Sequence, residues 1–249
     1  KKPFFAYVPF NAVHTPIEAT KKYQDRFPNE SNQTKRDYYA MTSALDDAVG
    51  SIVAVIDKHG LTDNTLVIFV NDNGGPTYTG VQSNGPLKLG KLFLFEGGIR
   101  VPMVFKLPGT FEPNTEYDQP TSTLDLFPTM CGVAGIELPA EIKLDGVDLT
   151  PFIEGKVSGS PHDTLLWSNG PNIAVRHGDW KLIEYFENGE FELYNLKQDI
   201  GETKDFSEEK PELVEKLSKM LEDWRTSSGS QMATPNPDYN PDKDWRKAP

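Results

Sequence analysis

The sequence predicts an α/β fold in which a mixed sheet is covered by helices, followed by a small antiparallel sheet with one helix. Three observations predict it. A long amphipathic helix leads into a short apolar strand between residues 37 and 70. A stretch rich in glycine, serine and proline, 155–163, then marks a boundary. Beyond it, short strands alternate with turn residues before one final amphipathic helix. We therefore expect two domains, 1–158 and 159–249.

The composition excludes several classes of protein. The chain has 249 residues, 37% of them hydrophobic, which is enough for one large domain or a domain and a half with a proper core. Acidic residues outnumber basic ones by 37 to 25, which argues against binding to nucleic acid or to anionic lipid. No run reaches the roughly 20 apolar residues that a membrane span needs. The sole cysteine, Cys131, has apolar neighbours, which indicates a buried structural thiol rather than a nucleophile.

The first residues predict a strand that ends near a histidine. Phe4–Phe10 is aromatic and β-branched, which is typical of a strand. Because the chain opens inside a strand, we expect further sequence ahead of it in the natural protein. Pro16 keeps the residue before it extended or turning, so His14 lies just past the strand end. By itself, a histidine in such a loop is more typical of a surface or capping position than of a catalytic one.

A helix and a strand follow a polar surface segment. Residues 17–36 are polar and interrupted by proline, with room for one helical turn. From Asp37 to His59 apolar residues recur every three or four positions, which predicts a long amphipathic helix that Gly60 ends. A short connection leads into Leu66–Val70, five apolar residues that are typical of a fully buried strand in a parallel or mixed sheet.

Polar residues and two glycines follow this strand. Asp72 and Asn73 therefore lie at the carboxyl end of a central strand, which is where ligands bind in open α/β sheets. The same residue types are also good turn formers, so the local sequence leaves a ligand site and a simple turn as alternatives. A long loop, Tyr78–Lys91, is expected to leave the same edge of the sheet. Lys91 follows a glycine and can reach an anion unhindered, although a solvated lysine is the usual interpretation.

Further elements are predicted downstream. Gly97 and Gly98 indicate close backbone approach or positive φ before a short strand at Met103–Lys106. Thr123–Gly135 predicts a helix. We expect its inner side to carry Leu124, Phe127, Met130 and Ala134.

The second domain is predicted to hold four strands and a helix. The expected strands are Thr164–Ser168, Ile173–Arg176, Trp180–Tyr185 and Phe191–Tyr194. The helix Pro211–Trp224 has its proline in the first turn, and the tail from Thr226 is expected to be extended or disordered. His162 and His177 are more typical of surface positions than of substrate contacts.

Eleven ordered blocks, which extend over nearly the whole chain, resemble the type I sulfatases of the alkaline phosphatase superfamily. None of them would be specific by itself. The blocks are Pro3–Tyr7 with His14–Pro16, Leu45–Gly50, Gly60–Phe69, Asp72–Gly74, Gly90–Lys91, Glu96–Pro102, Asp125–Thr129, Ala134–Ile136, Leu144–Leu149, Arg176–Leu182 and Glu192–Leu196. The resemblance implies a sulfatase-like mixed sheet covered by helices, present in part, plus a small C-terminal antiparallel sheet with one helix.

The resemblance also implies roles for four residues. Asp72 and Asn73 match the family's Asp-Asn pair that ligates a divalent cation, usually calcium, with magnesium as the alternative. Lys91 matches the lysine that contacts the sulfate group. His14 matches the histidine near the bridging oxygen of the ester, where charge appears on the leaving alkoxide. The implied reaction is hydrolysis of a sulfate ester, with a sulfated small molecule or glycan as substrate.

One departure from the family pattern matters most. The family's nucleophile is a formylglycine made from cysteine or serine in a Cys/Ser-x-Pro-x-Arg motif, and no residue of this chain fits that motif. We expect the nucleophile and the remaining metal ligands in a missing N-terminal part of the same fold, which would be the chain's partner. The 249-residue chain alone is therefore predicted to be inactive. A periplasmic or secreted location is expected from the resemblance alone.

Two other functions remain open from the sequence. A phosphodiesterase or phosphatase of the same superfamily would carry zinc or manganese on Asp and His clusters, but the chain has only four histidines and no evident Asp-x-x-x-His pair. A non-catalytic module that retains the fold is the other alternative.

Overall fold

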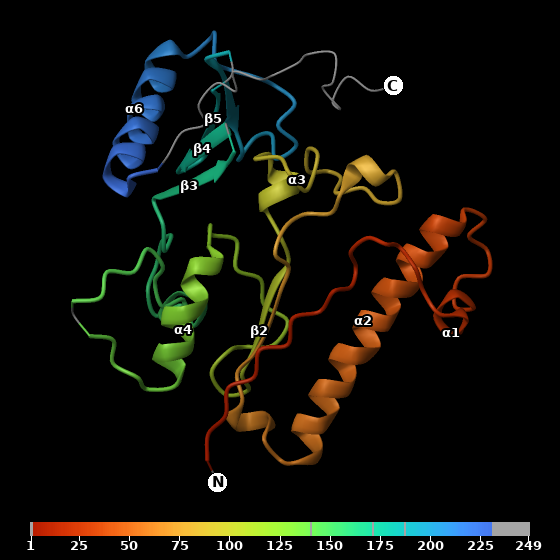
Figure 1. Cartoon of the computed structure of the whole chain (residues 1–249). Coiled ribbons are helices and arrows are strands. Elements are labelled where there is room, and N and C mark those ends of the chain that lie inside the picture. The colour runs from red at the N-terminus through yellow and green to blue at the C-terminus, as the bar shows by residue number, and fades with distance from the viewer. Residues whose placement is uncertain (1, 140, 171, 187, 231–249) are drawn as a thin grey trace. The chain divides into compact units, whose positions relative to one another are not determined.

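The computed structural model describes residues 2–139, 141–170, 172–186 and 188–230 (Figure 1). The chain divides into two compact units. The first comprises Lys1–Lys91 and Gly97–His162, and the second comprises Leu92–Glu96 and Asp163–Pro249. The second unit thus takes in a short stretch from the middle of the sequence as well as the C-terminal region. Most of the tail beyond Thr226, residues 231–249, lies outside the described residues.

The first unit begins its regular structure with two helices. The short α1, Lys21–Gln24, is the helical turn expected within the polar segment. The long α2, Gln33–Lys58, begins four residues earlier than its apolar pattern predicts. The reason is a cap: the side-chain oxygen of Asn32 accepts a hydrogen bond from the backbone N–H of Lys35 at 3.0 Å. The helix ends at the predicted place, where Gly60 has a φ of +62°.

By length and composition α2 is apolar enough to cross a membrane, with a mean hydropathy of 1.3 over 18 residues. A single helix of this kind is weak evidence for a membrane span, because core helices of soluble proteins meet the same criterion.

The predicted strand after α2 is present as β1, Val67–Val70. It pairs antiparallel with β2, Met103–Lys106, with Val67 opposite Lys106. All four residues of β1 are only half-buried, so the expectation of a fully buried strand is wrong for the described chain. A strand becomes fully buried when neighbours cover both of its edges and both faces, and β1 has one described strand partner.

The strand expected at Phe4–Phe10 is absent from the structure. This segment makes no backbone hydrogen bond to another described strand, and a strand requires such a partner. Its large side chains are exposed, with Phe5 at 76% and Tyr7 at 80%. The described residues therefore do not cover the apolar side chains of this segment.

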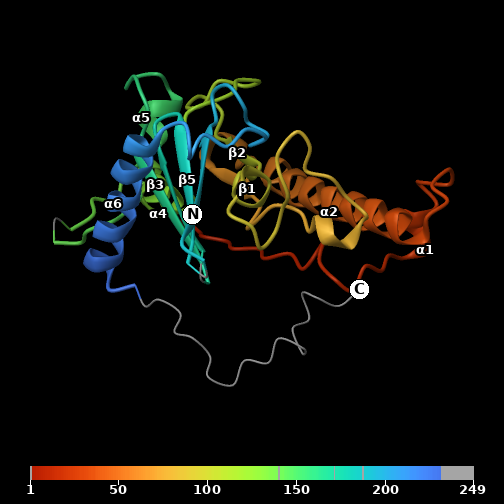
Figure 2. The ribbon, with the colours of Figure 1, turned by 90° about the horizontal axis from the view of Figure 1, so that it is seen from above.

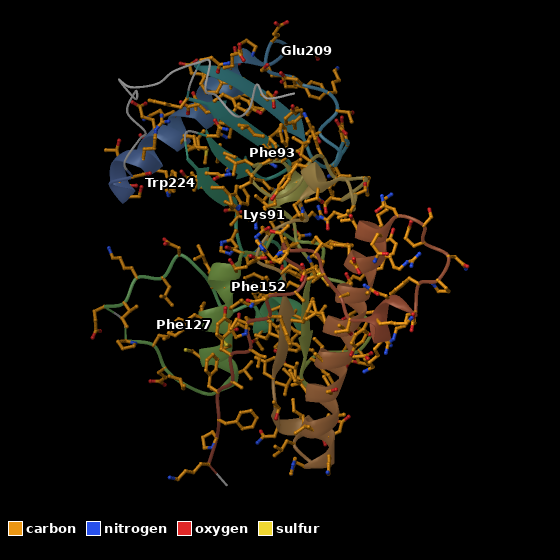
Figure 3. The ribbon with its side chains drawn as sticks, turned by 45° about the vertical axis from the view of Figure 1, so that its right-hand side comes forward. Lys91, Phe93, Phe127, Phe152, Glu209 and Trp224 are labelled. Atoms are coloured by element: carbon orange, nitrogen blue, oxygen red, sulfur yellow. The ribbon has the colours of Figure 1, made fainter. Side chains whose placement is uncertain are left out.

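The helix expected at Thr123–Gly135 is present as one 3-10 turn, Thr123–Asp125, followed by α4, Leu126–Val133. Its predicted inner side is wrong. Leu124 and Phe127 are 58% and 50% exposed, whereas Thr129 and Cys131 are buried; Figure 3 labels Phe127 on this helix. The buried thiol of Cys131 agrees with its predicted structural role.

A buried carboxylate determines which side of this helix faces inward. Asp125 is fully buried and accepts backbone hydrogen bonds from Ser122 at 2.7 Å and Val147 at 2.9 Å. It also contacts Nε2 of His162 at 2.8 Å. Because a buried carboxylate needs such partners, these contacts orient the helix more strongly than its apolar spacing does. A short helix, α5, Thr150–Ile153, follows.

The second unit contains all four predicted strands as a four-stranded antiparallel sheet. These are β3, Thr164–Asn169; β4, Asn172–His177; β5, Trp180–Tyr185; and β6, Glu190–Asn195, in that order. The predicted helix is α6, Pro211–Ser228, which begins at its proline as expected. It lies along one face of the sheet (Figures 1 and 2).

Alternate residues of the strands form the core between this sheet and α6. Every second residue of a strand faces the helix, and these apolar residues pack against Leu217 and Leu221. Trp224, labelled in Figure 3, packs at the edge of the same cluster. The buried members from the sheet are Ile173, Val175, Leu182 and Leu193.

The opposite face of the sheet carries a buried ionic cluster. Lys181 is fully buried, and its Nζ lies 3.1 Å from Oε1 of Glu96 and 2.8 Å from Oε1 of Glu202. The backbone N–H of Glu96 also donates to Oε2 of Glu202 at 2.7 Å. This network holds the segment Leu92–Glu96 in the second unit, because a buried ammonium and two carboxylates need one another as partners.

Candidate active site

The structure brings together two residues that lie 77 positions apart. Nζ of Lys91 is 2.9 Å from Nε2 of His14. An ammonium can only donate, so Nε2 of His14 accepts this hydrogen bond. The other ring nitrogen, Nδ1, then carries the proton and donates to the carbonyl oxygen of Thr15 at 3.0 Å. The contact therefore assigns one tautomer to the ring in this arrangement.

Asp72 and Asn73 follow β1, as the sequence predicts. Oδ1 of Asp72 accepts the backbone N–H of Asn73 at 2.9 Å, and the side chain of Asp72 is exposed. Within the described residues, the other carboxylate oxygen has no hydrogen bond, so it can bind a ligand. A carboxylate and an amide oxygen are hard donors of the kind that calcium and magnesium prefer. No group of three or more His, Cys, Asp or Glu side chains in the described ranges could hold a metal ion.

Close backbone contacts join the loops around these residues. Gly74 donates its N–H to the carbonyl oxygen of Gly98 at 2.9 Å. A Cβ atom on Gly74 would lie 1.7 Å from the carbonyl oxygen of Gly97. A Cβ atom on Gly97 would lie 2.3 Å from the carbonyl oxygens of Lys88 and Leu89. The prediction of close backbone approach at the paired glycines is thus confirmed for Gly97, because no side chain fits there.

His14, Lys91, Asp72 and Asn73 all border one concave surface of the first unit. Figure 3 labels Lys91 in its loop. His162 does not join them. Instead its side chain is nearly buried against Asp125, so its predicted surface position is wrong. In the second unit, Nδ1 of the half-buried His177 contacts Oγ1 of Thr164 at 2.8 Å.

Asn84 is a residue near this surface that sequence reasoning missed. Its side chain makes hydrogen bonds to the backbone on both sides of the loop, at Gly75 and at Leu89. The only signal in the sequence is an ordinary Asn-Gly-Pro turn, which says nothing about partners so far along the chain.

Comparison with known proteins decides the family. The family model described as Sulfatase matches residues 1–136, which is more than half of the chain. The chain belongs to the sulfatase family. A second model, described as N-sulphoglucosamine sulphohydrolase, C-terminal, matches residues 88–227 of this sulfatase. The resemblance inferred from the sequence is therefore confirmed.

Individual sulfatases are similar over much of the chain. A sulfatase of Formosa agariphila is 34% identical over 257 residues, covering 89% of this chain and 46% of the relative. The steryl-sulfatase of Rattus norvegicus is 38% identical over 173 residues, covering 66% of this chain and 28% of the relative. These coverages show that this sulfatase chain spans less than half of the length of these two relatives.

The solved structures confirm the fold class. The structure of Ps i-CgsB in complex with k-i-k-neocarrahexaose is 34% identical with a TM-score of 0.81. The match covers 90% of this chain and 50% of that one. The sulfatase-like α/β fold with its additional antiparallel sheet is thus present in the part of the fold that this chain contains.

Proposed function

We propose that this sulfatase chain supplies part of the active site of an enzyme that hydrolyses sulfate esters of a carbohydrate. The observation that carries the proposal is the contact of 2.9 Å between Nζ of Lys91 and Nε2 of His14. It brings two nitrogen groups side by side, and the backbone N–H of the same lysine donates at 3.2 Å to the carbonyl oxygen of Gly75, shortly after Asp72 in the sequence. A similar structure binds k-i-k-neocarrahexaose, and a similar protein is named N-acetylgalactosamine-6-sulfatase, which supports a carbohydrate substrate.

Lys91 and His14 have complementary tasks in this proposal. The ammonium of Lys91 binds the sulfate oxygens through charge-assisted hydrogen bonds. Once its protons point to the sulfate, Nε2 of His14 is released from the contact with Nζ. With Nδ1–H still donating to the carbonyl oxygen of Thr15, Nε2 takes up a proton from solvent and directs it toward the bridging oxygen, on which negative charge develops as the ester bond breaks. A compact pair of this kind lets a chain with a net charge of −12 bind an anion.

Asp72 and Asn73 are proposed to bind a divalent cation, calcium or alternatively magnesium, through their side-chain oxygens. Such a cation offsets the charge of the sulfate and orients the nucleophile when bound. The two residues are too few for a tight site, so further ligands must come from other polypeptide. The same applies to the formylglycine nucleophile, whose motif this chain does not contain.

We propose a missing N-terminal part of the same fold as the partner that completes the site. Its expected position is the exposed apolar surface of the first unit. There, Phe5 and Tyr7 are mostly exposed, as is Val55 on α2, and all three border the same concave surface. Exposed apolar surface of this extent is typical of a face that another polypeptide covers. The 249-residue chain alone is therefore proposed to be inactive.

The test compares the full-length gene product with the 249-residue chain. Both are assayed with 4-nitrophenyl sulfate and with neocarrahexaose, and released sulfate is quantified. We expect activity in the longer protein alone, lost on chelation and restored by calcium. Faster hydrolysis of 4-nitrophenyl phosphate would favour a phosphatase. No hydrolysis by the longer protein would favour the non-catalytic module, and sulfate release by the 249-residue chain would contradict the proposed partner.

The substitution Asp72→Asn tests the cation site. It keeps the shape of the side chain but removes its charge, so we expect the half-saturating calcium concentration to rise about 10-fold or more. Calcium titration of activity and of binding heat measures this change. The matched control is Asp46→Asn, which removes an exposed carboxylate from α2. Equal calcium dependence of both variants would exclude Asp72 as a ligand.

A further inference from the structure

The side-chain amide of Asn84 makes three hydrogen bonds within the first unit. Its Nδ2 donates to the carbonyl oxygen of Gly75 at 2.9 Å and to that of Leu89 at 2.8 Å. Its Oδ1 accepts the backbone N–H of Gly75 at 3.3 Å. Because both carbonyl groups can only accept, the partners determine which end of the amide is nitrogen. Asn84 therefore uses both protons of its amide group and its oxygen on backbone partners.

These partners lie next to the residues of the proposed active site. Gly75 is two positions after Asn73, and Leu89 is two positions before Lys91. The backbone N–H of Lys91 also donates to the carbonyl oxygen of Gly75, at 3.2 Å. The carbonyl of Gly75 thus accepts hydrogen bonds from Asn84 and from Lys91. The side chain of Asn84 and the carbonyl group of Gly75 therefore join the end of β1 to the loop Tyr78–Lys91, here called the lysine loop.

The two segments pack so closely that there is no room for a side chain at Gly90. A Cβ atom on Gly90 would lie 1.9 Å from the carbonyl oxygen of Gly75 and 2.5 Å from Nδ2 of Asn84. The first of these atoms is backbone and cannot move aside without displacing the segment after Asn73. Gly90→Ala should therefore separate the same two segments that Asn84 holds together.

We infer that Asn84 is a positioning residue that couples the cation-binding strand end to the sulfate-binding lysine. The inference rests on the proposed function. Without the amide group, the carbonyl of Leu89 loses its donor and the carbonyl of Gly75 keeps only the long bond from Lys91. The lysine loop then loses its register against Asp72 and Asn73. A displacement of this kind affects cation binding and sulfate binding together, because both groups of ligands share the Gly75 anchor.

The experiment measures both binding events in the full-length protein. For Asn84→Ala and Asn84→Asp, we determine the KM for 4-nitrophenyl sulfate, the inhibition constant of inorganic sulfate and, from binding heat, the half-saturating calcium concentration. We expect all three to rise about 10-fold. Asn84→Asp keeps the acceptor for Gly75 but turns a carboxylate oxygen toward two carbonyl groups, so it should be at least as harmful. Gly90→Ala should show the same combined change.

The matched control is Asn32→Ala, which removes a hydrogen bond from side chain to backbone at the start of α2. It should lower Tm while leaving the sulfate and calcium constants unchanged. If the Asn84 variants lower only Tm, or change the binding constant of only one of the two ligands, sulfate or calcium, the proposed coupling is overturned. If an Asn84 variant does not fold, Gly90→Ala provides the same measurement. A wild-type protein that responds to neither sulfate nor calcium would instead refute the proposed function.

Discussion

Replacing Lys91 with alanine is expected to lower kcat/KM of the full-length sulfatase by about 10³, with a change in Tm below about 2 °C. The reason is that Lys91 is only half-buried and its Nζ contacts the side chain of His14, not the core. Its backbone bond to Gly75 survives the substitution. We therefore expect the loss of the ammonium group to affect catalysis far more than folding. Steady-state kinetics and thermal unfolding of the same samples measure the two effects.

Two further variants sharpen this test. Lys106→Ala removes an equal charge from an exposed position on β2 and should leave kcat/KM within about twofold. In a double-mutant cycle, His14→Ala and Lys91→Ala should be strongly non-additive, because the two side chains are in direct contact. If Tm and activity fall together in Lys91→Ala, the lysine has a structural role.

Replacing Lys181 with methionine is expected to cost about 3–5 kcal/mol of unfolding free energy. Methionine fills a similar volume, but the carboxylates of Glu96 and Glu202 then remain buried without their shared cation. The hydrogen bond from the backbone N–H of Glu96 to Glu202 does not replace that cation. Urea unfolding, followed by the fluorescence of the second unit's tryptophans, measures the loss.

The same variant has a predictable pH dependence. Burial raises the pKa of the Glu202 carboxyl above its ordinary value, and Lys181 opposes this shift. Removing the lysine therefore raises that pKa further. A carboxyl with a raised pKa in the folded state binds protons more tightly when folded, so stability increases as the pH falls. The deficit of Lys181→Met should thus be smaller at about pH 5 than at about pH 7.

Lys197→Met is the matched control. Its ammonium is exposed and lies 3.7 Å from Asp179, and exposed pairs contribute only about 0–1 kcal/mol. We expect its urea midpoint to remain near that of the wild type at both pH values. A Lys181→Met variant that behaves like this control would show that the buried cluster contributes little to stability.

Local patterns predicted most elements of this chain. The apolar repeat of α2, the alternation in β3 to β6 and the proline that begins α6 depend on residues close together in sequence. Each of these elements was predicted to within a few residues, and the boundary of α2 moved only because Asn32 caps it. The expected inner face of α4 was wrong because Asp125 is oriented by partners from distant segments.

The candidate site, too, combines features that the local sequence predicts with contacts that only folding creates. The sequence by itself determined the family, the polar residues after β1 and the glycines that allow close backbone approach, because these are properties of residue type and spacing. Only the tertiary structure brought Nζ of Lys91 to His14, joined Gly75 to Leu89 through Asn84, and buried Lys181 between two carboxylates. Such contacts join residues far apart in the chain, so they form only when folding brings distant segments together.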